Sequence, residues 1–149
     1  MTQEFRTIFE KIDFVNRYKD LCSKFDNTDD SFENYENTKV KEVMESFGYK
    51  NIRYYKGEDF FEVENNDRLN SYNISLSISF KYGLCEIILS GAPLDAYLDL
   101  LNVDTGGLKL PAFRSYDELH EILSIAFGLY EDYKREMIAL YRASEDESN

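Results

Sequence analysis

The carboxylates of one short acidic run are the residues of this sequence with the clearest capacity for chemistry. The run DNTDDSFENYEN at residues 26–37 holds five acids and no base, a composition that suits a divalent cation. If its first aspartate opens a calcium loop, Ser31 takes the sixth position, which needs glycine, and Asn37 takes the twelfth, which needs a bidentate glutamate. The run therefore does not predict an EF-hand, and we expect no metal or cofactor. Looser cation binding by its aspartates stays open.

Nucleophilic catalysis has few candidates. The chain has one histidine, His120, and two cysteines, Cys22 and Cys85. A Cys–His pair needs contact in space and a group that orients the base, but both cysteines lie in apolar patterns and are expected as buried, reduced thiols. One histidine cannot build a multi-histidine zinc site, and Gly106-Gly107 lacks the spacing of a phosphate-binding loop. We therefore expect no enzymatic activity.

Helices are expected at the beginning of the chain. Residues from Gln3 to Phe25 show two apolar stripes at helical spacing, which predicts one helix that is contacted on two sides. A second helix is predicted from Thr38 to Phe47, with Gly48 as a left-handed C-terminal cap.

An antiparallel sheet of four to five strands is expected in the middle of the chain. Strands are predicted at 52–55, 60–64, 72–80 and 84–89, and the third shows strict alternation of apolar and small polar residues. An edge strand at 108–110 would be the fifth. Between the last two, we expect a short helix at 93–101 and a turn at 104–107.

A long C-terminal helix is expected to pack on this sheet. Ser115 is a suitable N-cap, and Glu118 three residues later completes a capping box. Gly128 inside the helix indicates a close backbone contact, because glycine costs about 1 kcal/mol there relative to alanine. Residues 143–149 are expected to be a frayed polar tail. The chain of 149 residues thus predicts one α+β domain over residues 1–149.

Charge is distributed unevenly along the chain. There are 29 acids and 17 bases, for a net charge of −12. Such a field repels nucleic acid and anionic lipid and attracts basic proteins, so we expect neither nucleic acid nor membrane as a partner. The windows 25–38, 82–108 and 115–133 hold fourteen of the acids and none of the bases. They predict a coherent negative face if folding brings them together, whereas each one alone is typical of a solvated surface.

The candidate contact residues combine these acids with tyrosines. Tyrosine is rigid and amphipathic and is favoured at protein interfaces. Asp117 and Glu118 are explained by the dipole of a helix first turn. Other acids have no such local explanation. The residues expected to contact a partner are Asp26, Asp29, Asp30, Glu33, Tyr35, Asp95, Tyr97 and Asp99.

The end of the chain resembles a known group of proteins. Leu110-Pro-Ala-Phe113 is followed by Ser115-Tyr-Asp-Glu-Leu119 at the start of a long helix. With the acidity and the α+β pattern, this ending resembles the immunity proteins that neutralise bacterial contact-dependent or polymorphic toxins. The resemblance implies a cognate toxin partner, often a cationic nuclease, that is blocked by direct binding. It carries over no set of residues.

We therefore expect a cytoplasmic, acidic protein-binding module that inhibits a basic toxin. The N-terminal residues carry charges throughout and show no signal peptide, and no apolar run is long enough to span a bilayer. Two alternatives stay open: a structural adaptor that self-associates through exposed aromatic residues, and a small hydrolase that uses two carboxylates, whose separation a sequence does not reveal. Homo-oligomerisation also stays open.

Overall fold

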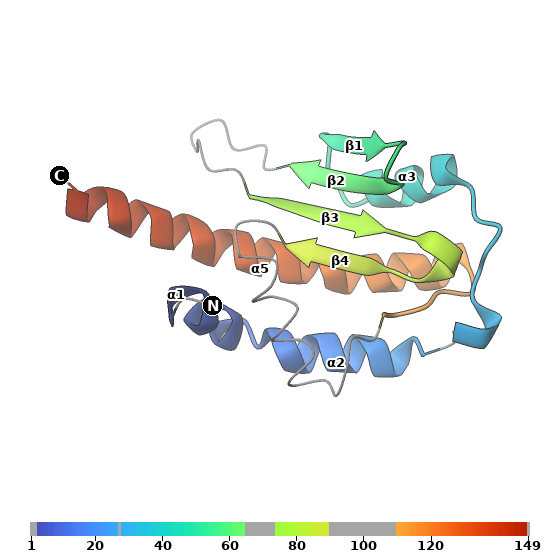
Figure 1. The fold of residues 1–149 in the computed structure, drawn as a ribbon, viewed down its shortest axis with the longest axis horizontal. Coiled ribbons are helices and arrows are strands. Elements are labelled where there is room, and N and C mark those ends of the chain that lie inside the picture. Colours follow the sequence, from blue (N-terminus) through green and yellow to red (C-terminus); the bar gives the residue numbers. More distant parts are fainter. Residues whose placement is uncertain (1–2, 27, 65–73, 90–109, 149) are drawn as a thin grey trace.

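The computed structural model describes residues 3–26, 28–64, 74–89 and 110–148, which form an α+β fold (Figure 1). Its helices are α1 (Gln3–Lys11), α2 (Phe14–Lys24), α3 (Asn37–Glu45) and α5 (Tyr116–Ser148). Its strands are β1 (Ile52–Tyr55), β2 (Phe60–Glu64), β3 (Ser75–Ser79) and β4 (Glu86–Leu89). The single-turn 3-10 helices are η1 (Thr28–Asp30) and η2 (Lys81–Gly83). The expected fold class is confirmed.

The four strands form one antiparallel sheet in the order β1-β2-β3-β4. Alternation within β3 sends Leu76 and Ile78 to a buried face, and the register places Leu76 between Val63 of β2 and Leu89 of β4. The strands expected at 52–55 and 60–64 are confirmed with the same bounds, whereas β3 and β4 are shorter than expected. The expected helix at 93–101, the turn at 104–107 and most of the edge strand at 108–110 lie outside the described residues.

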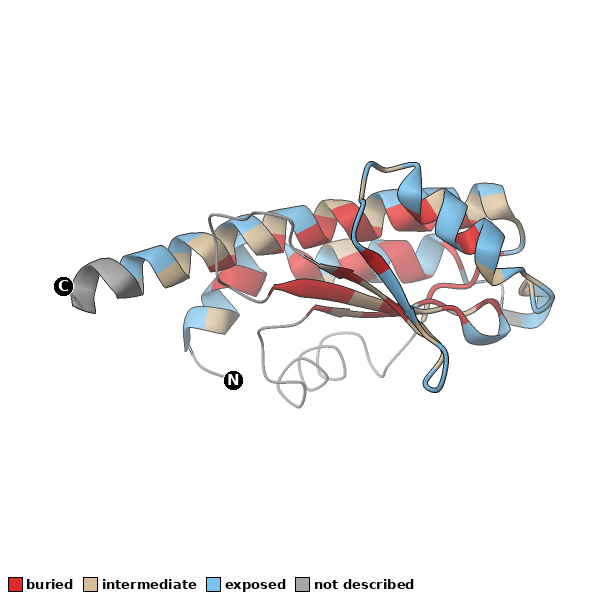
Figure 2. Cartoon of the chain, turned by 90° about the horizontal axis from the view of Figure 1, so that it is seen from above, coloured by how far each residue is buried: buried red, intermediate tan, exposed pale blue. Residues whose placement is uncertain are grey.

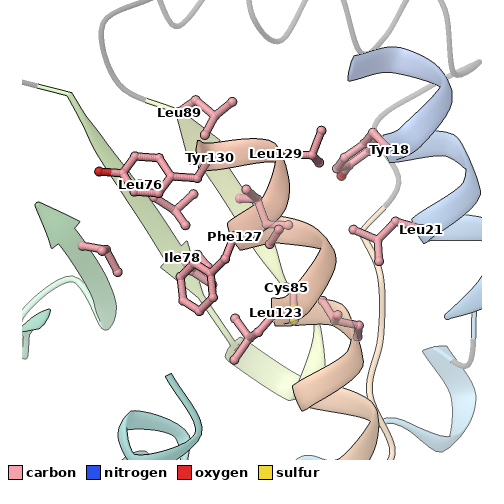
Figure 3. Packing of buried hydrophobic residues seen from close by; sticks show 14 of the residues in the cluster. Tyr18, Leu21, Leu76, Ile78, Cys85, Leu89, Leu123, Phe127, Leu129 and Tyr130 are labelled. Atoms are coloured by element: carbon pink, nitrogen blue, oxygen red, sulfur yellow. The ribbon is translucent and has the colours of Figure 1, made fainter. Parts of the chain in front are cut away.

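Helix α5 is the centre of the core, because it packs on the sheet and also contacts α1, α2 and α3. Figure 3 shows Phe127 and Tyr130 on the side of Leu76, while Leu129 lies on the side of Tyr18. Each large side chain removed from water contributes about 1.5–3 kcal/mol, so this two-sided helix accounts for much of the hydrophobic stabilisation. Figure 2 shows the buried residues gathered where the helices and the sheet face one another, with exposed residues on the outer surfaces.

The expected single helix from Gln3 to Phe25 is wrong, because the chain breaks at Asp13. This residue is in the left-handed conformation, with φ of 54°. Aspartate tolerates that conformation because its short side chain can bond locally, and here Asn16 donates to its carboxylate at 2.9 Å. The break brings the rings of Phe9 and Phe14 edge to face, with 5.1 Å between centroids. The two apolar stripes therefore belong to two helices.

Arg17 connects the break between α1 and α2 to α5 through a hydrogen bond and an ion pair. Its Nη1 donates to the backbone carbonyl of Ile12 at 3.0 Å and to the carboxylate of Asp132 at 2.7 Å. Main-chain acceptors at a helix end lack a helical partner, so the first bond satisfies one of them. A Cβ at Gly128 would lie 3.5 Å from the guanidinium of Arg17, an ordinary contact distance. The close backbone contact expected at Gly128 is therefore wrong, because the near neighbour is the side chain of Arg17.

The start of α5 is capped as expected, with one difference. The backbone N–H of Glu118 donates to Oγ of Ser115 at 3.2 Å. The Glu118 carboxylate accepts from the backbone N–H of Arg114 at 2.8 Å, one residue before the position used in a regular capping box. The helical backbone continues to Ser148 and so includes most of the tail for which we expected fraying.

Candidate functional site

An acidic loop, described at residues 26 and 28–36, joins α2 to α3 and is connected to the sheet by the segment before α5. In the middle of the loop, the backbone N–H of Phe32 donates to the carbonyl of Phe113 at 2.8 Å. The N–H of Phe113 donates in turn to the carbonyl of Gly83 at 3.0 Å. These main-chain bonds fix the acidic loop against η2, at the end of the molecule opposite both termini (Figure 1).

Gly83 determines how closely the acidic loop approaches η2. Its φ is 76°, a conformation that favours glycine. A Cβ at this position would lie 2.7 Å from the backbone nitrogen of Phe32 and 2.9 Å from the Cβ of Ser31. The two backbones are therefore in direct contact, which leaves no room for a side chain between them.

The aromatic residues of the acidic loop pack inward while its acids are exposed. The Phe32 ring lies edge to face on Tyr116, with 5.1 Å between centroids, and Tyr35 packs on Phe113 at 5.9 Å. The exposed acids are Asp26, Asp29, Asp30, Glu33 and Glu36. The rings of Phe32 and Tyr35 thus anchor the loop on Tyr116 and Phe113, while its carboxylates face solvent.

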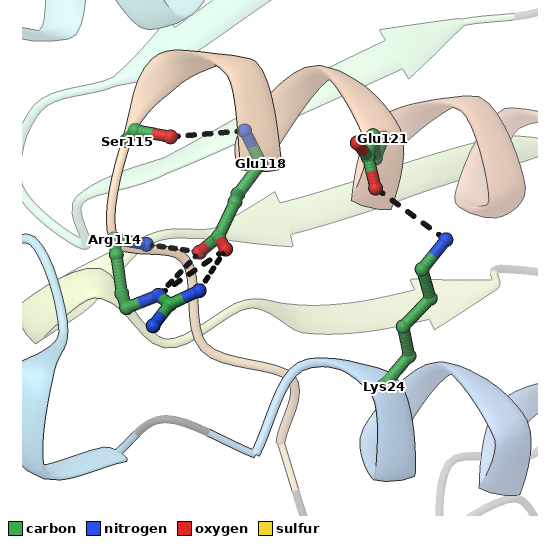
Figure 4. A network of polar contacts seen from close by, with 5 residues as sticks. All are labelled: Lys24, Arg114, Ser115, Glu118 and Glu121. Atoms are coloured by element: carbon green, nitrogen blue, oxygen red, sulfur yellow. Dashed lines mark hydrogen bonds and ion pairs between the residues drawn. The ribbon is translucent and has the colours of Figure 1, made fainter.

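Ion pairs distinguish the acidic loop from the window at 115–133. Four of the five acids in that window pair with bases that lie outside it. Figure 4 shows two of these pairs. They join Arg114 to Glu118 at 2.8 Å and Lys24 to Glu121 at 3.4 Å. The other two join Lys134 to Glu131 at 3.0 Å and Arg17 to Asp132 at 2.7 Å. Glu118, Glu131 and Asp132 are therefore offset by close bases, whereas Lys24 and Glu121 are both more than half exposed and form only a weak pair.

The acidic loop keeps most of its charge. In the described part of the chain, no ion pair involves Asp26, Asp29, Asp30 or Glu33. Glu36 pairs with Lys39 at 3.5 Å, but both side chains are more than half exposed, and such pairs are weak. The hydrogen bond to Glu118, together with its charge, raises the pKa of Arg114, and the charges of Asp30 and Asp26 add smaller increases. Arg114 therefore moderates the negative field around Asp26 and Asp30.

A depression of about 510 Å³ lies beside the acidic loop, and we call it the tyrosine recess. Its lining residues are Glu33, Tyr35, Asn37, Asp59, Lys81 and Tyr82. They come from the acidic loop with the first residue of α3, from the β1–β2 loop, and from η2. The first and third turns of an antiparallel meander lie at the same end of the sheet, which brings these three segments together.

Tyr54 joins two sides of the tyrosine recess. Its hydroxyl accepts from Nδ2 of Asn37 at 3.0 Å and donates to the carboxylate of Asp59 at 2.6 Å. The bond to Asp59 raises the pKa of Tyr54, because it favours the protonated phenol. Tyr54 is 37% exposed and Tyr82 is 70% exposed, and they are the exposed large hydrophobic side chains of the described residues. The most accessible aromatic surface therefore lies at this recess.

Tyr35 offers a free polar group to the tyrosine recess. Burial raises the pKa of Tyr35 to about 12, and the charge of Asp59 contributes to that rise, so the hydroxyl stays protonated at neutral pH. Within the described ranges, nothing forms a hydrogen bond with this hydroxyl. It is available to a ligand both as a donor and as an acceptor.

The structure groups the five expected contact residues of the N-terminal half on one loop. Asp95, Tyr97 and Asp99 lie outside the described residues. Sequence reasoning missed Tyr54, which lies in the strand predicted at 52–55, and also missed Asp59 and Tyr82, which lie in connections between predicted strands. The signal that could have joined Asp59 and Tyr82 was that their connections are the first and third turns of a meander.

The described residues show no arrangement that resembles a metal centre. No three or more His, Cys, Asp or Glu side chains among them gather as cation ligands. His120 is exposed and stacks on Phe47, with 4.6 Å between ring centroids. Cys22 and Cys85 are free and buried, and burial raises the pKa of the Cys85 thiol. None of the described helices has the length and apolar character needed to cross a membrane.

No protein-family model, curated protein or solved structure matches this chain. The acidic loop and the tyrosine recess therefore carry the functional interpretation. Both offer charge, hydrogen bonding and aromatic surface at one end of the fold.

Proposed function

We propose that this protein is a binding module that docks its acidic loop on a basic protein and inhibits it, as immunity proteins inhibit toxins. One observation supports the proposal above the rest: the loop presents exposed carboxylates without ion pairs, while most acids of the window at 115–133 are paired. Carboxylates without an internal partner are free to form charge-assisted hydrogen bonds with lysine and arginine of another protein. They also accelerate encounter with a cationic surface.

The anchoring of the acidic loop at Phe32 favours this role. The loop is held by main-chain bonds to Phe113 and by the contact at Gly83. A surface that is already ordered loses less conformational entropy when it binds, which increases affinity.

Self-association through aromatic residues has less support. Across the described residues, the exposed large hydrophobic side chains are Tyr54 and Tyr82, and both carry a hydroxyl. A stable homodimer normally buries a wider and more apolar surface. We therefore favour a different protein as partner. Light scattering at low and high salt separates the two, because a hydrophobic dimer survives high salt.

The test uses the protein encoded by the neighbouring gene, since toxins and their immunity proteins are usually encoded side by side. Association is measured by biolayer interferometry over a range of NaCl concentrations, and inhibition by growth of cells that express both proteins. The test variant combines Asp26→Asn, Asp29→Asn and Asp30→Asn. We expect its association rate at low salt to fall by about tenfold, with a shallower dependence on salt.

The matched control removes the same number of charges from α1 and α2. It combines Glu4→Gln, Glu10→Gln and Asp20→Asn, which are exposed positions. Its association rate should stay within about twofold of the unmodified protein, because distant exposed charges are screened by salt. Equal losses in the two triple variants would reject the acidic loop as the docking surface. If the product of the neighbouring gene neither binds this protein nor harms cells, the proposed inhibitor function is rejected.

A further inference from the structure

The tyrosine recess has a chemistry that the acidic loop alone does not have. Two carboxylates, of Glu33 and Asp59, meet the exposed ring of Tyr82 and the hydroxyl of Tyr35 around one depression of about 510 Å³. A flat acidic surface would attract any cation. A recess with an aromatic wall selects for a cation that is planar and weakly hydrated.

We propose that the tyrosine recess receives one arginine side chain of the basic partner; this assignment rests on the proposed function. The guanidinium is planar, presents a fork of N–H donors to carboxylates, and stacks on aromatic faces. Glu33 and Asp59 accept its hydrogen bonds, and Tyr82 provides the face on which it stacks. The hydroxyl of Tyr35 accepts a further N–H, which gives that group a partner.

The charges around the recess favour a cation despite one lysine. Lys81 also lines the recess, and in the part of the chain that the structure describes it forms no ion pair. It also lines a second depression, whose lining includes Glu58 and Glu86. The two depressions that Lys81 borders are thus lined by four carboxylates and one ammonium group. The carboxylate of Asp59 already accepts from Tyr54 at 2.6 Å, which fixes its orientation and leaves further lone pairs for a guanidinium.

An arginine also fits the recess better than a lysine. An ammonium group is a compact, strongly hydrated charge that meets carboxylates one bond at a time, and it loses more hydration when it enters a recess. The acceptors of the recess come from two segments: Glu33 and Tyr35 from the acidic loop, and Asp59 from the β1–β2 loop. A forked donor can bond to both segments at once, whereas an ammonium group meets them less completely.

The test is an NMR titration of the isotope-labelled full chain with Nα-acetyl-L-arginine amide. We expect saturating shifts for the amides of residues 33–37, 58–59 and 81–83. Nα-acetyl-L-citrulline amide has nearly the same shape without the charge, and should give no saturating shift. Nα-acetyl-L-lysine amide should bind more weakly than the arginine probe.

Two variants assign the contacts. Tyr82→Asn removes the ring and keeps a residue that tolerates the φ of 58° found there. Glu33→Gln removes one carboxylate. Each should weaken binding of the arginine probe by about threefold, the size of one exposed cation–π or charge contact. The control Asp20→Asn, on α2, should leave it unchanged, and amide spectra and melting curves verify that each variant is folded.

The outcomes separate this inference from the proposed function. Equal shifts with arginine and citrulline, shifts scattered over the acidic surface, or no effect of the two variants would reject the arginine assignment. If the triple variant of Asp26, Asp29 and Asp30 loses partner binding and Tyr82→Asn does not, the recess is rejected as the arginine site. The acidic loop then remains the docking surface. Absence of partner binding, with the probe still bound at the recess, would reject the partner and not the recess chemistry.

Discussion

Replacement of Gly83 by alanine would place a methyl carbon 2.7 Å from the backbone nitrogen of Phe32 and 3.1 Å from its carbonyl oxygen. Carbon atoms do not approach backbone atoms this closely, so the acidic loop would have to move away from η2. That movement strains two hydrogen bonds in series, from Phe32 to Phe113 and from Phe113 to Gly83, which are now 2.8 and 3.0 Å long. The perturbation thus acts on the surface that we propose as the docking site.

The expected loss of stability follows from two contributions. The left-handed conformation at φ of 76° costs an alanine about 1–2 kcal/mol, and each weakened main-chain bond costs about 1 kcal/mol. We therefore expect Gly83→Ala to lower the free energy of unfolding by about 3–4 kcal/mol. Urea unfolding measures this change. Hydrogen exchange should show faster exchange at the amides of Phe32 and Phe113, because the acidic loop separates from η2.

Two other glycines provide matched controls. Gly48 has φ of 93° and open space where a Cβ would lie, so Gly48→Ala isolates the cost of conformation, about 1–2 kcal/mol. Gly57 has open space without a positive φ, so Gly57→Ala should change stability by less than about 0.5 kcal/mol. If Gly83→Ala costs no more than Gly48→Ala, the contact between the acidic loop and η2 does not hold the loop, and the reasoning fails.

Three further changes test other parts of the structure. Gly128→Ala should stabilise the protein by about 0.5–1 kcal/mol in urea unfolding, because alanine is the better helix former and the site has room for a methyl group; a loss of stability would contradict that geometry. Glu118→Gln should destabilise at neutral pH and have a smaller effect at acid pH. The hydrogen bond from Arg114 holds the pKa of Glu118 below its usual range, so the stabilisation is present above the usual pKa and is lost as the pH falls through the lowered one. A destabilisation that is equal at both pH values would exclude this pair as the cause. Tyr130→Phe should cost about 0.5–1.5 kcal/mol, because it removes the buried hydroxyl that donates to the carbonyl of Ile74 at 3.1 Å, and a neutral result in thermal unfolding would show that water replaces the bond.

The amino-acid sequence by itself determined the elements whose signals are local. Strict alternation specified which face of β3 is buried, and the apolar runs at 52–55 and 60–64 specified β1 and β2. Ser115 and Glu118 located the start of α5. Such signals can be predicted because they depend on side-chain periodicity and on capping within one turn of backbone.

Only the tertiary structure decided the contacts that join distant parts of the chain. Arg17 and Asp132 are separated by 115 positions, and their pairing both fixes the break between α1 and α2 and neutralises a carboxylate that looked available in the sequence. The tyrosine recess likewise needs the loop after β1 and the turn after β3 at the same end of one sheet. The charge that a surface presents depends on which bases fold against its acids, and that is a property of three-dimensional packing and not of spacing along the chain.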